Sequence, residues 1–210
     1  EFNADGVRFL TWSGSSIRIW DTATGSLLGT LSIDSFPGFR GVIWHGDQIL
    51  NWLGGTINLW DGLSPENNAG FLVPGENFNS WPGNASWNQA QTHFLTWNNA
   101  VDESVPMVRM WQVADDFEDA TPILAFEHGG INNDESIDGA AWSPDETMIV
   151  SWSHSWAKVW DASNGALLHT VNTDSYLTDA RWSPNSRYIL VEDIRENQAR
   201  IWDVATGEEV

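Results

Sequence analysis

The sequence predicts an all-β chain built from five copies of one short unit. Tryptophan is unusually frequent, with 15 in 210 residues, which indicates one motif copied several times. A short apolar segment that ends in Trp-Asp, followed by a turn rich in Thr, Asn and Gly, occurs four times. A fifth copy has Gln in place of Asp. The pairs are Trp20-Asp21, Trp60-Asp61, Trp111-Gln112, Trp160-Asp161 and Trp202-Asp203.

Two further aromatic series run in phase with these pairs. One series lies well upstream of each pair, and the other lies between that series and the pair. The upstream series is Phe2, Trp44, Trp87, Trp142 and Trp182. The intermediate series is Trp12, Trp52, Trp97 and Trp152, with Glu192 at the fifth place. Three series in phase through five units define a repeat, and we expect their tryptophans and the Trp-Asp pairs to be structural.

Each unit is predicted to consist of strands. Polar and apolar side chains alternate in residues 8–12 and 16–20, and such alternation places one face of a strand in a core. Gly and Pro in the intervening segments, as at Thr24-Gly25, supply the backbone angles of tight turns. The predicted strands are residues 8–13, 16–21, 48–53, 56–61, 92–97, 107–112, 147–152, 157–161, 187–191 and 199–203.

With these features the units resemble WD repeats, whose four-stranded antiparallel blades circle a central channel in a β-propeller. The best copy of the pattern runs from Trp142 through Trp160-Asp161 to Gly165. Two features usual in the family are missing: the Gly-His dipeptide before the innermost strand, and the Asp in the turn between the second and third strands. In the family these groups join Ser and Trp in a buried network. We therefore expect that network not to form in its usual way, and burial of the Trp rings to replace it.

The resemblance implies one propeller domain over residues 1–210, with blades at about 1–36, 40–75, 83–128, 138–173 and 178–210. The first blade lacks most of its innermost strand and the last lacks most of its outermost strand. We expect a larger ring of about seven or eight blades, with a closed ring of five as the alternative. The rest of a parent chain, or a neighbouring chain, would then cover the open sheet edges.

The charge of the chain restricts its partners. Acidic residues number 29 and basic residues 9, for a net charge of −20. Phosphate groups are bound by clustered Lys and Arg, so this balance argues against nucleic acid and against an anionic membrane surface. It favours solubility and a protein partner with a basic segment. The absence of Cys excludes disulfides and Cys-ligated zinc. Separately, the family resemblance favours an intracellular location over an extracellular one.

Two acidic loops are longer than the repeat requires. Residues 100–106 separate the second and third strands of the third unit, and residues 129–138 link the third unit to the fourth. Both kinds of loop emerge on the same face of a WD-type blade. We expect this face to bind a basic segment, with Trp156 in a turn there as an aromatic anchor; a solvated rim is the alternative. The candidate partner-binding residues are Asp102, Glu103, Asp134, Glu135, Asp138, Trp156, Glu192 and Asp193.

No catalytic residues, cofactor or metal site are predicted. The five His residues fall in different units without a shared spacing, and neither a His-Glu-x-x-His motif nor a Gly-x-Ser-x-Gly elbow occurs. The oxygen-rich segment 132–138 does not match an EF-hand loop. The sequence therefore predicts a non-catalytic WD-repeat scaffold or sensor module that binds a protein. The alternatives are a structural repeat in a larger assembly or filament, and the regulatory arm of a multidomain enzyme.

Overall fold

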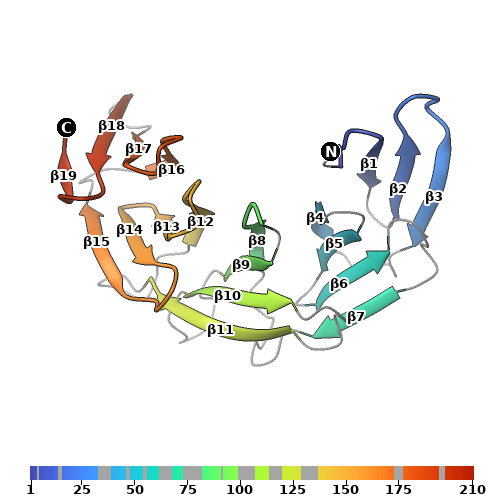
Figure 1. Cartoon of the computed structure of the whole chain (residues 1–210), viewed down its shortest axis with the longest axis horizontal. Coiled ribbons are helices and arrows are strands. Elements are labelled where there is room, and N and C mark those ends of the chain that lie inside the picture. Colours follow the sequence, from blue (N-terminus) through green and yellow to red (C-terminus); the bar gives the residue numbers. More distant parts are fainter. Residues whose placement is uncertain are drawn as a thin grey trace. The chain divides into compact units, whose positions relative to one another are not determined.

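Every regular element in the described part of the chain is a β-strand, as the computed structural model shows (Figure 1). It describes residues 1–3, 5–13, 16–32, 39–45, 48–53, 56–61, 68–72, 82–90, 92–98, 107–113, 120–128, 137–172, 177–193 and 197–210. Within these ranges no helix is long and apolar enough to cross a membrane. The chain divides into two compact units, residues 1–78 with 113–121 and residues 79–112 with 122–210.

The first unit contains two antiparallel sheets in which each strand pairs with the next along the chain. The first sheet consists of β1 (Arg8–Ser13), β2 (Ser16–Asp21) and β3 (Leu27–Ser32). Phe2 forms an isolated bridge with Phe9 beside β1. The second sheet consists of β4 (Phe39–His45), β5 (Gln48–Leu53), β6 (Thr56–Asp61) and β7 (Asn68–Leu72).

Three four-stranded sheets with the same order make up nearly all of the second unit. The third sheet consists of β8 (Pro82–Trp87), β9 (His93–Asn98), β10 (Met107–Val113) and β11 (Ala120–Glu127). The fourth consists of β12 (Ile137–Trp142), β13 (Met148–Ser153), β14 (Trp156–Asp161) and β15 (Leu167–Asn172). The fifth consists of β16 (Leu177–Trp182), β17 (Tyr188–Asp193), β18 (Gln198–Asp203) and β19 (Glu208–Glu209).

All ten strands predicted from the sequence are confirmed to within two residues. The alternation that predicted them separates buried from exposed side chains: Ile17 and Ile19 are buried in β2, whereas Arg18 between them is exposed. This is the pattern expected when one face of a strand is packed and successive side chains point to opposite faces.

The cores lie between neighbouring sheets. In the first unit one buried cluster joins the first and second sheets, with Leu10 and Trp44 among its members. In the second unit one cluster joins the third and fourth sheets through Phe126 and Trp160, and another joins the fourth and fifth through Val150 and Ile189. Within each unit, neighbouring sheets therefore bury their apolar side chains against one another, as in any layered β architecture.

Within the described residues, three of the Trp-Asp pairs lead into a turn of one recurring geometry. The Oδ1 atom of Asp161 accepts hydrogen bonds from the backbone N–H and the hydroxyl of Ser163, at 2.8 and 2.6 Å. Gly165 then adopts φ +77° and donates its N–H to the Asp161 carbonyl at 2.9 Å. Because L side chains rarely adopt this left-handed conformation, the turn favours Gly. The Asp21–Gly25 and Asp203–Gly207 turns close with the same backbone bond.

Candidate partner-binding site

A polar contact joins the start of the fourth sheet to the turn between β13 and β14. Oδ2 of Asp138 lies 3.0 Å from Nδ1 of His154, and the two side chains are 31% and 40% exposed. Asp138 falls in a β-bulge between Ile137 and Gly139. Burial raises the pKa of the Asp138 carboxyl above its usual range, and the neighbouring His154 opposes this rise. A partly desolvated carboxylate is thus held at the surface by the adjoining turn.

Trp156 occupies a different position from the one expected. It is the first residue of β14, paired with Asn172 of β15, and not part of the preceding turn. Its side chain is half-buried. The strand begins earlier than predicted because the turn between β13 and β14 needs only His154 and Ser155. Part of the ring nevertheless remains accessible.

The fifth sheet places another candidate residue at the corresponding end. Glu192 is the next-to-last residue of β17 and pairs with Asp179 of β16 beside a bulge. The fourth and fifth sheets meet at this end, where the Leu177 N–H donates to the His154 carbonyl at 2.7 Å. Asp138, His154, Trp156 and Glu192 therefore lie at one end of these two sheets, which we call the loop end.

The remaining candidate residues cannot be placed in full. Asp102, Glu103, Asp134 and Glu135 lie outside the described residues. Asp193 ends β17, where its backbone pairs with Leu177, but its side chain is not described.

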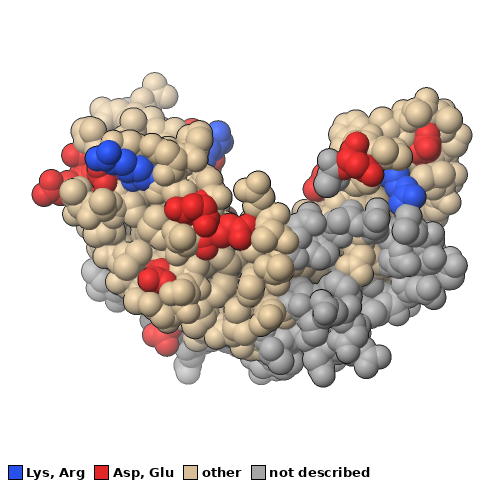
Figure 2. All heavy atoms as spheres, viewed as in Figure 1, with Lys and Arg blue, Asp and Glu red and all other residues tan. Residues whose placement is uncertain are grey.

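In the second unit, basic side chains lie beside some of the acidic ones. Nε of Arg181 lies 2.6 Å from Oδ2 of Asp179, and this carboxylate together with Glu192 raises the pKa of Arg181. In Figure 2 acidic side chains occur at several separate places on the face of the second unit turned to the viewer, with basic side chains among them. Among the residues described, no three His, Asp or Glu side chains are grouped to hold a metal ion.

A repeated hydrogen bond inside the sheets was not foreseen from the sequence. In four of the five Trp-Asp or Trp-Gln pairs, the indole N–H of the Trp donates to a polar side chain on the neighbouring strand, two residues beyond its own pairing partner. The four bonds run from Trp20 to Thr11 at 2.8 Å, from Trp60 to Asn51 at 2.6 Å, from Trp111 to Thr96 at 2.9 Å and from Trp160 to Ser151 at 2.8 Å. The signal was present as a polar residue at one place in an otherwise apolar strand.

One of these bonds extends into a buried network, which corrects an expectation from the sequence. Nδ1 of His128 lies 2.7 Å from Oγ of Ser151, which also accepts the Trp160 N–H. His128 follows β11 and precedes Gly129, so its order relative to Gly is the reverse of the family dipeptide. We expected the network not to form in its usual way, yet the His, Ser and Trp members are joined. The turn between β13 and β14, where the family usually has Asp, consists of His154 and Ser155.

The environment of His128 determines its charge. Burial lowers the pKa of His128 to about 3, and the charge of Lys158 contributes to the same effect. The Lys158 ammonium donates to the His128 carbonyl at 2.6 Å. His128 is therefore neutral at physiological pH and acts as a structural hydrogen-bonding group.

The repeated meander of four antiparallel strands, with Trp bonded across the sheet and Asp capping the next turn, defines a WD-type β-propeller blade. A chain from the crystal structure of a mitotic checkpoint complex has the same fold. The TM-score is 0.73 at 17% sequence identity, over 97% of this chain and 59% of that chain. No protein-family model matches the chain.

Two curated proteins are similar in sequence. The WD repeat-containing protein AAC3 of Dictyostelium discoideum is 32% identical over 76 residues, 35% of this chain and 16% of that protein. The eukaryotic translation initiation factor 3 subunit I of Culex quinquefasciatus is 25% identical over 202 residues, 88% of this chain and 57% of that protein. The chain thus spans less than two thirds of each relative. With the repeat and the fold, these similarities support the resemblance to WD-repeat proteins.

Proposed function

We propose that this chain is a non-catalytic WD-repeat scaffold that binds a protein partner through the loop end of its fourth and fifth sheets. The observation that carries the proposal is the gathering of Asp138, Trp156 and Glu192, from three different strands, at that end. The acidic segment 129–136 directly precedes β12 in the sequence. Two of the similar proteins are a subunit of an initiation factor and a chain of a checkpoint complex, and both names describe assemblies.

The chemistry of the loop end suits a basic polypeptide segment. Carboxylates on the ends of hydrogen-bonded strands keep their positions when a partner binds, so little conformational entropy is lost. Trp156 adds a large apolar ring that is partly accessible, and Trp is common at the centres of protein interfaces. The net charge of −20 would speed the approach of a basic partner from a distance.

A charge-reversal experiment tests this proposal with octalysine as the probe. We expect Asp134→Lys combined with Glu135→Lys to weaken octalysine binding strongly. Glu208→Lys combined with Glu209→Lys is the matched control, since it changes the net charge equally but alters β19. Fluorescence anisotropy of labelled octalysine would be measured across salt concentrations, and binding should weaken above about 0.15 M, where the Debye length is about 8 Å.

The comparison of the two double variants decides the result. Selective loss in the Asp134 and Glu135 variant supports a binding site at the loop end. Equal loss in both variants would mean that octalysine responds only to net charge, and the loop end would then be an ordinary solvated rim.

A further inference from the structure

A groove of about 690 Å³ opens between the third and fourth sheets, inside the second unit. Its volume falls within the range of small-molecule and side-chain binding sites, about 300–1,000 Å³. The groove lies at the turn between β12 and β13, at the opposite end of β13 from the loop end. Apolar and polar groups both line it, among them Met110, Leu124 and Ala162, and Glu146, Thr147 and Asp161. None of the described lining residues is Lys or Arg.

The junction between the fourth and fifth sheets has a position equivalent to the one that Thr147 holds beside the groove. Arg187 holds that position. The Ala162 N–H donates to the Thr147 carbonyl at 3.0 Å, and the Val204 N–H donates to the Arg187 carbonyl at 2.9 Å. The two junctions can therefore be compared residue by residue.

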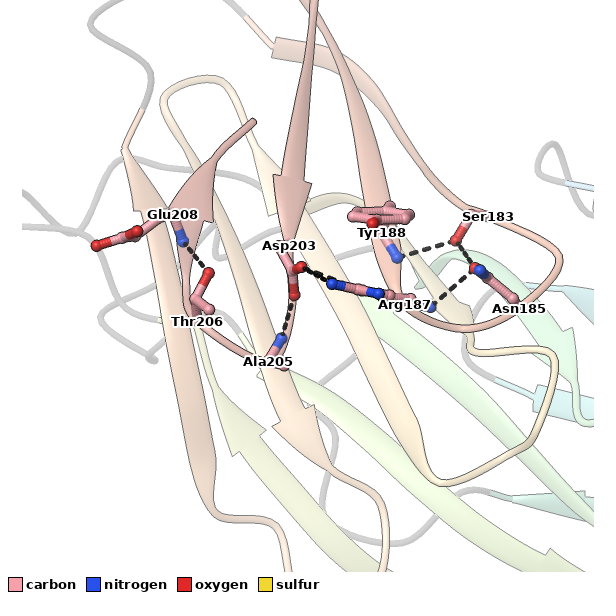
Figure 3. A network of polar contacts seen from close by, with 8 residues as sticks. All are labelled: Ser183, Asn185, Arg187, Tyr188, Asp203, Ala205, Thr206 and Glu208. Atoms are coloured by element: carbon pink, nitrogen blue, oxygen red, sulfur yellow. Dashed lines mark hydrogen bonds and ion pairs between the residues drawn. The ribbon is translucent and has the colours of Figure 1, made fainter.

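In the later junction the Arg187 side chain pairs with the Asp of the repeat (Figure 3). Its Nη2 and Nε atoms lie 2.9 and 3.1 Å from Oδ2 of Asp203, while Oδ1 of Asp203 accepts the Ala205 N–H at 2.9 Å. The Asp203 side chain is only 11% exposed. One carboxylate oxygen thus caps the turn and the other binds a guanidinium, a charge-assisted arrangement.

At the groove the cationic half of this arrangement is missing. Thr147 is too short to cross to Asp161, and its hydroxyl instead donates to Asp145 at 2.9 Å. Asp161 still caps its turn through Ser163, and that hydrogen bonding lowers the pKa of its carboxyl, so it is ionised at neutral pH. Ala162 also replaces the larger Val204, which leaves more room beside the carboxylate.

A second carboxylate borders the groove. Glu146 accepts the Ala90 N–H at 2.6 Å through Oε1 and the Asn88 side-chain amide at 3.0 Å through Oε2. At the junction between the fourth and fifth sheets, the equivalent residue is Ser186, whose hydroxyl oxygen accepts the Asp145 N–H at 3.0 Å. Glu146 and Ser186 thus link equivalent turns at successive junctions, but only Glu146 brings a carboxylate.

From these observations we propose that the groove between the third and fourth sheets binds an arginine side chain supplied by a partner protein. The guanidinium would lie against Asp161 and Glu146, in the manner of Arg187 against Asp203, and its methylene stem would pack on Leu124 and Ala162. Arginine fits better than lysine because its planar fork binds carboxylates through two parallel hydrogen bonds. This site is separate from the loop end and does not depend on it.

The test is an NMR titration of the ¹⁵N-labelled chain with N-acetyl-arginine N-methylamide in a buffer free of guanidinium. We expect saturable shifts at the amides of Thr147, Ala162 and Ser163. The citrulline analogue has the same shape without the charge, and it should bind about tenfold more weakly or worse, because charge-assisted bonds are lost. The lysine analogue should also bind more weakly.

Two variants complete the design. Thr147→Arg should fill the groove from within and abolish the shifts, and Arg187 shows that the repeat accommodates Arg at this position. Asp161→Asn should weaken arginine binding about tenfold while an Asn side chain still caps the turn. Equal binding of arginine and citrulline, or shifts that persist in Thr147→Arg, would overturn the proposal. Amide spectra of the ligand-free variants establish that each is folded.

Discussion

The contribution of one buried tryptophan hydrogen bond to stability can be measured in the fifth sheet, where that bond is missing among the described residues. Its Trp202 indole N–H is buried and, within the described residues, has no hydrogen-bond partner. Val191 stands at the register position that Thr96 holds in the third sheet, where the Trp111 N–H donates to the Thr hydroxyl. Val and Thr have nearly the same shape. Val191→Thr therefore adds the missing acceptor, and Thr96→Val removes an existing one.

The structure sets the expected magnitudes of the two changes. Thr96→Val leaves the Trp111 N–H unpaired at a fully buried site, which should lower the free energy of unfolding by about 1–3 kcal/mol. Val191→Thr should raise it by up to about 1 kcal/mol, because burial of the new hydroxyl offsets part of the gain. For a chain of this size, 1 kcal/mol corresponds to a shift in Tm of about 2–4 °C.

Urea and thermal unfolding followed by circular dichroism measure both effects. Val150→Thr is the matched control, since Val150 is fully buried and lies one position from the acceptor site, so its new hydroxyl does not face the Trp160 N–H. We expect the control to be destabilised. If Val191→Thr were destabilised as much as Val150→Thr, the shared register would not place a hydroxyl at Trp202, and the reasoning would be wrong.

Three other substitutions have outcomes that follow from single contacts. The pKa of His128, about 3 when folded against 6.5 when unfolded, means that the unfolded chain binds a proton the native chain lacks. Stability should therefore fall as pH drops below 6.5, by about 2 kcal/mol at pH 5, and His128→Gln should flatten this dependence in urea melts at several pH values. Gly139→Ala would place a methyl group in the Trp152 ring, so denaturation should show a loss of at least about 1–3 kcal/mol. Gly165→Ala meets only ordinary contacts but keeps a left-handed φ of +77°, and its midpoint in urea should reflect a loss of about 1–2 kcal/mol.

The strands of this protein were predictable from the sequence because their causes are local. Alternation in segments such as β2, the Trp-Asp pairs and the Gly residues that close the turns each depend on neighbours a few residues apart. A repeat multiplies this local signal, since five imperfect copies confirm one another. The same copying supported the family resemblance, which predicted four-stranded antiparallel blades.

Contacts between sheets were decided only by the tertiary structure. The bond from His128 to Ser151 joins residues 23 positions apart, and neither residue by itself indicates that the other is its partner. Trp156 similarly begins a strand because the preceding turn is short. These features depend on how backbones pair and pack, which the spacing of residue types does not specify.

The groove beside Asp161 is the clearest case of this difference. In the sequence, nothing distinguishes Thr147 from Arg187 as the residue that follows a turn. Nothing distinguishes Glu146 from Ser186 within the turn either. The backbone bonds show that Thr147 and Arg187 occupy equivalent places, and that Asp203 is paired with its own arginine while Asp161 lines a groove without Lys or Arg among its described lining residues. The sequence by itself determined the repeated blade, since strand and turn formation depend on local side-chain pattern. The tertiary structure decided where a groove opens between blades, since that depends on the volumes and charges of side chains brought together from different blades.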